Sequence, residues 1–235
     1  MQDFSTIFAQ SIGLILGGDA QLWAVIFLSL KVSLLAVLAS GIIGLPLGAL
    51  LAVGRFRGRQ AVIVLVNALM GLPPVVVGLI VYLMLSNTGP FGVFQLLYTP
   101  TAMIIAQTVL VTPIVAALAR QLLETLDAEY SEQLRSFGVS RLGTVPTLLW
   151  DGRYGLMTAL LAGFGRAIAE VGAVIIVGGN INHVTRVMTT SIALETSRGN
   201  LALALALGAI LVAMAIVVNA AVTVLGLSAR QAANV

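Results

Sequence analysis

The sequence predicts an all-α protein, a polytopic bundle of five transmembrane helices with the N-terminus outside and the C-terminus in the cytosol. Three observations lead to this fold class. The chain of 235 residues is 59% hydrophobic and 9% charged, with a mean hydropathy of +1.07, whereas soluble domains carry about 25% charged residues. Five segments stay apolar for the roughly 20 residues that a helix needs to cross a bilayer. Arginines gather in the links on one side of these segments.

The same composition excludes several classes of protein. Twelve basic and nine acidic residues are too few to cover the surface of a soluble enzyme, a nucleic-acid-binding protein or a disordered chain. The chain has no cysteine, one histidine and one lysine, which excludes a disulfide framework, a thiol nucleophile and a cysteine metal site. We therefore expect no cofactor and no metal in this chain.

The expected spans follow one another without an internal repeat. They are residues 32–53, 61–86, 100–119, 154–177 and 201–227. The first can extend outward to Leu22. Residues 4–16 are apolar but too short to cross the membrane, and we expect them to form an interfacial helix. We interpret residues 22–227 as one transmembrane domain, preceded by an extracytoplasmic or interfacial segment (1–21) and followed by a cytosolic tail (228–235).

The distribution of arginine sets the expected orientation. Two links and the C-terminal tail carry eight arginines, which are Arg55, Arg57, Arg59, Arg120, Arg135, Arg141, Arg153 and Arg230. The opposite side carries only Arg186 and Arg198. Because cytosolic loops are enriched in basic residues, the arginine-rich side should face the cytosol.

Small and helix-disturbing residues lie within the expected spans. Gly44 and Gly48 form a small-xxx-small pair around Pro46, a spacing that lets two helix backbones approach closely. Further disturbing residues are Gly71, Pro73, Pro74, Gly78 and Pro113. Kinks in mid-membrane fit a moving transport pathway, although each proline taken alone fits a packing role as well.

Charged side chains in mid-membrane are rare and costly. Arg166 and Glu170 lie near the middle of the fourth expected span, and their i, i+4 spacing places both on one helix face, where each can neutralise the other. Such a pair can belong to a pathway or gate, or it can join helices structurally. Lys31 borders the first span and is expected to reach the outer interface, and we expect Thr108 and Thr112 to bond to their own backbone.

The longest cytosolic link, residues 120–153, predicts a helix–turn–helix beneath the membrane. Its first part has an apolar stripe at helical spacing, formed by Leu126, Tyr130, Leu134 and Phe137. Gly138 is a natural helix stop, and Thr144 with Pro146 can begin a second helix. The mixed charges of the link suit a protein partner, and the alternative is an amphipathic link lying on the bilayer.

Residues 132–141 of this link, EQLRSFGVSR, resemble the EAA loop of type I ATP-binding-cassette (ABC) importer permeases. Glu132, Gly138 and Ser140-Arg141 match the pattern, whereas Gln133-Leu134 replace its alanine pair and residues 148–151 replace its ending. The resemblance implies the fold of a type I ABC importer transmembrane domain, with the cytosolic helix–turn–helix as its coupling element. The residues that it implies for ATPase coupling are Glu132, Arg135, Gly138, Ser140 and Arg141.

Residues 163–173, GFGRAIAEVGA, followed by GGNI at 178–181 and Thr185-Arg186, resemble the oxyanion branch of these permeases, which includes molybdate, sulfate and tungstate permeases. Thr189-Thr190 and LETSRGN at 194–200 are most similar to the tungstate permeases. The resemblance covers about residues 20–227. The residues that we assign to a translocation pathway or gate are Arg166, Glu170, Asn180, Thr185 and Arg186.

The resemblance implies a homodimeric permease, served by two cytosolic ABC ATPase subunits and an extracytoplasmic oxyanion-binding protein, in the cytoplasmic (inner) membrane of a prokaryote. It implies tungstate import by alternating access, with molybdate or sulfate as alternative substrates. The chain lacks a GxxxxGK[ST] loop, so ATP is expected on the ATPase and this chain is not expected to be an enzyme. A secondary transporter, an intramembrane serine protease and a structural subunit are weaker alternatives, and no nucleic acid is expected as a partner.

Overall fold

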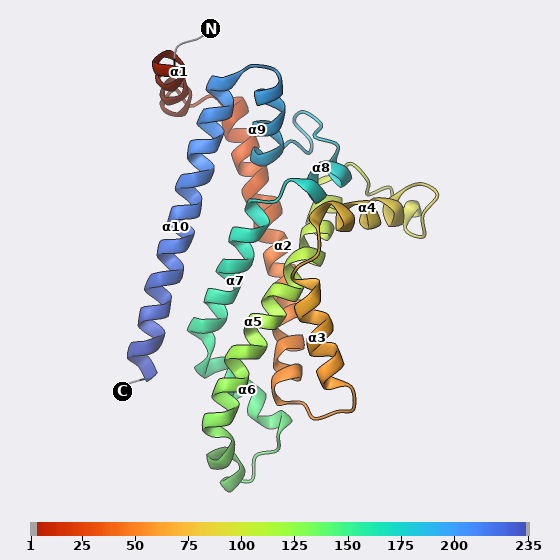
Figure 1. Cartoon of the computed structure of the whole chain (residues 1–235), viewed down its shortest axis with the longest axis vertical. Coiled ribbons are helices and arrows are strands. Elements are labelled where there is room, and N and C mark those ends of the chain that lie inside the picture. The colour runs from red at the N-terminus through yellow and green to blue at the C-terminus, as the bar shows by residue number, and fades with distance from the viewer. Residues whose placement is uncertain (1–3, 234–235) are drawn as a thin grey trace. The chain divides into compact units, whose positions relative to one another are not determined.

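The computed structural model describes the backbone of residues 4–233 and the side chains of residues 5–224. This part of the chain contains ten α-helices, two short 3-10 helices and no strand (Figure 1), which confirms the all-α fold class. The α-helices are α1 Phe4–Leu16, α2 Ala20–Val53, α3 Arg59–Leu69, α4 Pro74–Leu85, α5 Pro100–Ser136, α6 Val145–Asp151, α7 Arg153–Ile168, α8 Gly172–Gly178, α9 Met188–Ser197 and α10 Leu201–Ala233. The 3-10 helices are η1 Gly92–Phe94 and η2 Leu142–Thr144.

Three described helices are long and apolar enough to cross a membrane: α2, α5 and the Leu201–Val224 part of α10. Two further spans arise only if α3 is taken with α4, and α7 with α8, across breaks of at most four residues. Three of the five expected spans are therefore continuous helices, whereas each of the other two corresponds to a pair of helices bent by 102° or 61°. Pro73 explains the first break, because proline excludes the preceding residue from the helical region and lacks an N–H donor.

The chain divides into two compact units. The first comprises residues 1–36, 73–107 and 167–217, and the second comprises residues 37–72, 108–166 and 218–235. The single domain expected over residues 22–227 stays a prediction. Helix α10 continues to Ala233 through most of the expected cytosolic tail. The side chain of Arg230 and residues 234–235 lie outside the described residues.

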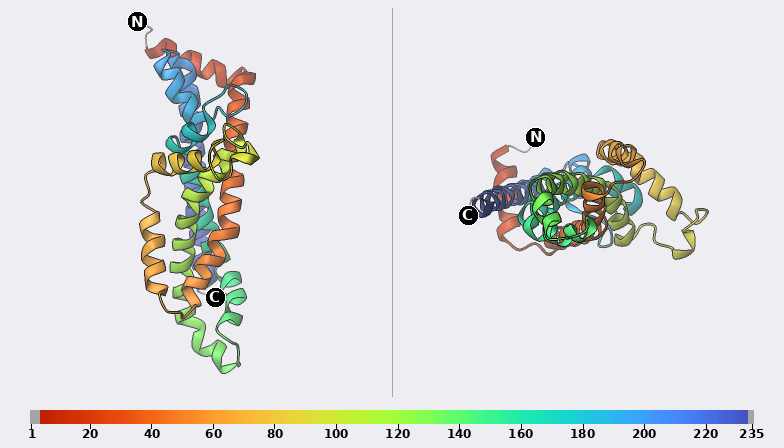
Figure 2. Two further views of the ribbon diagram at one scale, coloured as in Figure 1. Left: turned by 90° about the vertical axis from the view of Figure 1, so that its right-hand side faces the viewer. Right: turned by 90° about the horizontal axis from the view of Figure 1, so that it is seen from below.

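In the second unit, α2 packs closely against α5. A Cβ atom at Gly48 would lie 2.7 Å from the carbonyl oxygen of Ala116, and one at Gly44 would lie 3.1 Å from that of Thr112. The small-xxx-small pair therefore makes the close backbone contact predicted for it. Helix α3 lies beside α5 (Figure 2), where Ile63 and Val66 are buried in a cluster with Ala116 and Ala117.

In the first unit, α4 packs against α8, because Gly78 brings the backbones together: a Cβ atom there would lie 2.7 Å from the Cα atom of Ala173. Helix α1 lies beside the beginning of α10 (Figure 2), and the Ser11 hydroxyl is 2.8 Å from the carbonyl oxygen of Ala202. The helical expectation for residues 4–16 is thus confirmed, whereas its placement at the membrane interface stays a prediction.

Helix α9 was not predicted. It follows a loop, residues 179–187, and its first N–H group, that of Met188, donates 2.8 Å to the Ser29 hydroxyl of α2. The two hydroxyls at Thr189 and Thr190 and the carboxylate of Glu195 are buried. These polar side chains pack inward, so a hydropathy profile could not distinguish the helix from an exposed loop.

Candidate functional site

The helix stop predicted at Gly138 is confirmed. Gly138 has a φ angle of +75°, and its N–H donates to the carbonyl of Arg135 at 2.9 Å. The Val139 N–H donates to the carbonyl of Leu134 at 3.1 Å. These bonds close the end of α5, and the left-handed conformation at this position favours glycine. Nothing lies within 4 Å of a Cβ atom built on Gly138, so backbone conformation alone accounts for the glycine.

A tight turn and a second helix follow, as predicted. The Ser140 hydroxyl accepts the N–H of Gly143 at 3.2 Å, and the Thr144 hydroxyl donates to the carbonyl of Arg141 at 2.6 Å. Helix α6 then begins at Val145, with Pro146 in its first turn, where the missing proline N–H costs nothing. The helix–turn–helix that the sequence predicts is therefore present.

Helix α6 is anchored by one fully buried side chain. Leu148 is 0% exposed and packs in a cluster with buried residues of α2 and α5, among them Ala52 and Leu123. Leu126 and Tyr130 of the expected apolar stripe pack against the same cluster. Phe137, by contrast, lies just after α5 and is 81% exposed, so the packed part of the stripe does not include it. Because close-packed side chains transmit displacement, a movement of α6 reaches α2 and α5 directly.

The coupling segment, which we define as residues 132–153, presents apolar surface outside this anchor. Phe137, Leu142 and Trp150 are 81%, 65% and 69% exposed. The Arg153 guanidinium lies 4.9 Å from the ring centre of Trp150 and 4.6 Å from that of Tyr154. Exposed aromatic side chains with a neighbouring arginine are typical of protein-binding surfaces.

The five residues expected to couple to an ATPase all lie in this segment. Glu132 and Arg135 are exposed on the last turns of α5, whereas Gly138, Ser140 and Arg141 form the turn that follows. The structure thus brings them together at one end of the second unit.

An ion-pair network that sequence reasoning missed ties the same unit together. The Glu124 carboxylate of α5 pairs with Arg59 of α3 and, at 2.5 Å, with Arg120 of α5 itself. Arg59 Nε also donates to the carbonyl of Leu51, near the end of α2, at 2.7 Å. The i, i+4 spacing of Arg120 and Glu124 could have indicated half of the network. Arg59 comes from a distant part of the sequence, and from the sequence it was only one of the arginines that set the expected orientation in the membrane.

The prediction that Arg166 and Glu170 lie on one face of a single helix is wrong. Helix α7 ends at Ile168, so Glu170 lies in the break before α8. Its side chain is buried, and Oε1 accepts the N–H of Ala173 at 3.2 Å, the first turn of α8. The Thr189 hydroxyl donates to the backbone carbonyl of Glu170 at 2.8 Å. The break contains no proline, and these tertiary bonds stabilise it in place of helix hydrogen bonds.

Gln107 of α5 extends this polar region of the first unit. It is 3% exposed, its Nε2 donates to the carbonyl of Ala167 at 3.0 Å, and its Oε1 is buried without a hydrogen-bond partner. Thr112 behaves as expected, because its hydroxyl donates to the carbonyl of Thr108 at 2.7 Å. The same Ala167 carbonyl also accepts the N–H of Glu170 at 3.2 Å, so Gln107 gives a second hydrogen bond to the end of α7, a role that its sequence position did not reveal.

The loop of residues 179–187 holds the remaining expected pathway residues. The Thr185 hydroxyl is buried, donates to the carbonyl of Gly178 at 2.5 Å and accepts the N–H of Ile181 at 2.9 Å. Asn180 Nδ2 donates to the carbonyl of Thr190 at 3.4 Å. The side chains of Thr185 and Asn180 therefore form hydrogen bonds with the backbone of the loop and its neighbours. The Nε atom of Arg186, by contrast, is buried without a hydrogen-bond partner.

Among ionisable groups at this end of the first unit, Tyr98 shows a perturbed pKa. A hydrogen bond with Tyr82 is the main cause that raises the pKa of Tyr98, and burial adds to it. The two rings pack edge to face with their centres 6.4 Å apart. In the part of the chain that the structure describes, no three His, Cys, Asp or Glu side chains gather as metal ligands.

The amino-acid sequence of the chain is similar to those of known membrane transport proteins. The family model described as binding-protein-dependent transport system inner membrane component matches residues 44–231. A probable anion ABC transporter permease of Haloferax volcanii is 41% identical, over 82% of this chain and 85% of that protein. The tungstate uptake system permease protein TupB of Peptoclostridium acidaminophilum is 39% identical, over 92% of this chain and 94% of that protein. TupB of Campylobacter jejuni is 38% identical, over 70% and 69%.

Proposed function

Since this chain belongs to the family of binding-protein-dependent transport system inner membrane components, we propose that it translocates tungstate as the permease subunit of an ABC importer. The chain is a multi-pass membrane protein, and the ATP hydrolysis that drives such importers lies on a separate subunit. The observation that carries the substrate is the likeness to tungstate uptake permeases over nearly the whole chain. We place the importer in the cytoplasmic membrane of a prokaryote.

The assembly that we propose contains two copies of this chain, two ATPase subunits and an extracytoplasmic tungstate-binding protein. The exposed apolar surface of the coupling segment supports docking of an ATPase there. Glu132, Arg135 and Arg141 add charges of both signs that can pair with charges on the ATPase.

Movement of the ATPase subunits reaches the spans through α6. Leu148 connects α6 to α2 and α5, and hydrogen bonds at Gly138 and Ser140 hold the preceding turn. Displacement of the coupling segment therefore moves packed helices rather than a free loop. The result is alternating access, with the breaks between α3 and α4 and between α7 and α8 accommodating the change.

The pathway residues act at different levels. Arg166 and Arg186 supply positive charge for a divalent anion, and Glu170 limits that attraction so that the anion leaves again. Asn180 and Thr185 hold the loop that carries Arg186. Tungstate and molybdate are nearly equal in size and charge, so discrimination between them is assigned to the binding protein.

The test is ATP-driven uptake in proteoliposomes that contain this chain, its ATPase and the binding protein. Tungstate, molybdate and sulfate are offered separately and in competition. Tungstate uptake that molybdate barely disturbs supports the proposal. Uptake of only molybdate or sulfate would change the assigned substrate and leave the proposed ATP-driven mechanism unchanged. Uptake driven by an ion gradient without the ATPase identifies a secondary transporter and contradicts the mechanism.

A further inference from the structure

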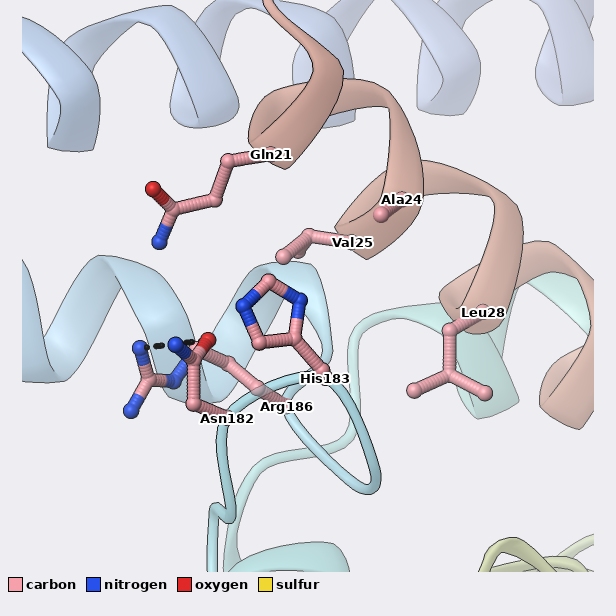
Figure 3. A pocket seen from close by; sticks show the side chains of 7 residues that line it. All are labelled: Gln21, Ala24, Val25, Leu28, Asn182, His183 and Arg186. Atoms are coloured by element: carbon pink, nitrogen blue, oxygen red, sulfur yellow. Dashed lines mark hydrogen bonds between the residues drawn. The ribbon is translucent and has the colours of Figure 1, made fainter.

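A small pocket lies where the beginning of α2 meets the loop of residues 179–187, both in the first unit. Its volume is about 110 Å³, enough for a few water molecules. The lining residues are Gln21, Ala24, Val25, Leu28, Asn182, His183 and Arg186. Figure 3 shows the Gln21 amide and the Arg186 guanidinium at one end of this pocket, Leu28 at the other and the His183 imidazole between them.

The pocket is built from fixed parts. The Ser29 hydroxyl of α2 accepts the N–H of Met188, which follows the loop directly. The N–H groups of Val184 and Arg186 both donate to the carbonyl of Ile181, at 3.2 and 3.1 Å. His183 is held at a φ of +60°, a left-handed conformation that is uncommon for residues other than glycine. The backbone at His183 is thus held by the loop, and its exposed side chain lines the pocket.

Each polar side chain that lines the pocket can donate a hydrogen bond, and none of them is acidic. Arg186 uses one terminal nitrogen to bond Asn182 Oδ1 at 3.1 Å and the other to bond the carbonyl of Asn180 at 3.5 Å. Its Nε is buried without a partner. The nearby acidic residue Asp19 uses Oδ1 to cap α2 through the N–H of Leu22, at 2.8 Å. One guanidinium, one imidazole and two amides form a donor set that suits an anion with several oxygens.

We propose that this pocket is an outer binding site for a divalent tetrahedral oxyanion, in which Arg186, His183 and Gln21 contact the anion. The inference rests on the proposed function, because it describes where the transported anion first meets the permease. His183, Gln21 and Asn182 are additions to the expected pathway residues. A site with one guanidinium and two amides binds weakly, as a site on a pathway must.

The chain carries one histidine, and this makes the test unusually direct. Protein labelled with ¹⁵N-histidine is reconstituted in nanodiscs without ATPase or binding protein, so the imidazole of His183 is its only labelled side chain. Sodium tungstate, sodium sulfate and sodium chloride are titrated at matched ionic strength. We expect a saturable shift of the imidazole signals with tungstate and sulfate but not with chloride. An equal shift with chloride, or no shift with tungstate, overturns the site.

Three variants refine the result. Arg186→Gln should raise the tungstate concentration at half-maximal shift about tenfold or more, because a charged donor is lost. Gln21→Leu lies on α2, outside the loop, and should weaken the response without disturbing the loop. Arg198→Gln is the matched control, since Arg198 is the other outer arginine, is 57% exposed and pairs with Glu195. A response unchanged by Arg186→Gln and Gln21→Leu, or lost in Arg198→Gln, contradicts the assignment.

Failure of this inference is distinguishable from failure of the proposed function. If the full assembly takes up tungstate but the His183 signals do not respond, the proposed oxyanion site is rejected and the proposed transport function is retained. If the His183 signals respond saturably but tungstate is not taken up, the oxyanion site is retained and tungstate is rejected as the transported substrate.

Discussion

At the scale of single residues, two glycines fix local structure in different ways. Gly48 permits contact between two helices, whereas Gly138 permits a backbone conformation. Both roles depend on the missing side chain, but they fail in different ways. A side chain at Gly48 collides with a neighbour, and a side chain at Gly138 strains its own backbone. The two positions therefore give separate predictions.

Gly138→Val should uncouple ATP hydrolysis from uptake. A β-branched residue in the left-handed region is strained by about 1–2 kcal/mol, which displaces the turn between α5 and α6. Measurement combines ATPase activity and tungstate uptake in the same proteoliposomes. Gly138→Asn is the matched control, because asparagine tolerates this conformation. Normal uptake by the valine variant at equal expression would falsify the role of the turn.

Gly48→Ala should lower the thermal stability of the purified protein. Its new Cβ atom would meet the carbonyl oxygen of Ala116 at 2.7 Å, and such overpacking costs about 1–3 kcal/mol. Gly165→Ala provides the comparison in the same unit, because nothing lies within 4 Å of its Cβ position. Equal melting temperatures for the two alanine variants would show that α2 and α5 do not pack as described.

At the scale of helices and their connections, the break between α7 and α8 depends on Glu170. Its carboxylate accepts an N–H group of α8, and its backbone carbonyl accepts the Thr189 hydroxyl of α9. One residue therefore joins the break to two helices. Its negative charge is a separate property, since an uncharged acceptor can fill the same structural role.

Glu170→Ala and Glu170→Gln separate structure from charge. Alanine leaves the buried N–H of Ala173 without its acceptor and should cost about 1–3 kcal/mol of stability. Glutamine retains an acceptor oxygen, so its melting temperature should stay near that of the parent while tungstate uptake changes. Melting curves and uptake assays on both variants decide the matter. Full uptake by the glutamine variant would reduce Glu170 to a structural residue.

At the scale of the whole molecule, the chain belongs to a family of transport-system components, which implies partner subunits. Its coupling segment exposes aromatic side chains, and such surface is typical of interaction sites. The proposed docking of an ATPase on the second unit can therefore be tested by association alone, independently of the cargo.

Trp150→Ala should weaken association with the ATPase. Trp150 is 69% exposed on α6 and stacks with Arg153, so its loss removes an interface anchor without opening the core. Co-purification with the ATPase from solubilised membranes measures the effect. The chain has one other tryptophan, and Trp23→Ala on α2, where Trp23 is 51% exposed, is the control. Equal recovery of ATPase with both variants would contradict docking at α6.

Features that depend on local sequence were predictable. Apolar runs located three helices long enough to cross a membrane and two bent helix pairs. Gly138 ended α5, Pro146 accompanied the start of α6, and the Gly44–Gly48 spacing marked a close helix contact. Each follows from hydropathy or from the backbone preference of a few neighbouring residues. The motifs that resemble oxyanion permeases are local in the same sense.

Tertiary contacts decided the rest. The break at Glu170 lacks proline and depends on Thr189 of another helix, and Arg59 and Glu124 meet from positions 65 residues apart. His183 and Gln21 line one pocket although 162 positions separate them. Sequence periodicity reports which side chains are apolar, but it does not report which distant partner a polar side chain finds. For this reason the spans were readable from the chain, and the polar contacts that shape its candidate sites were not.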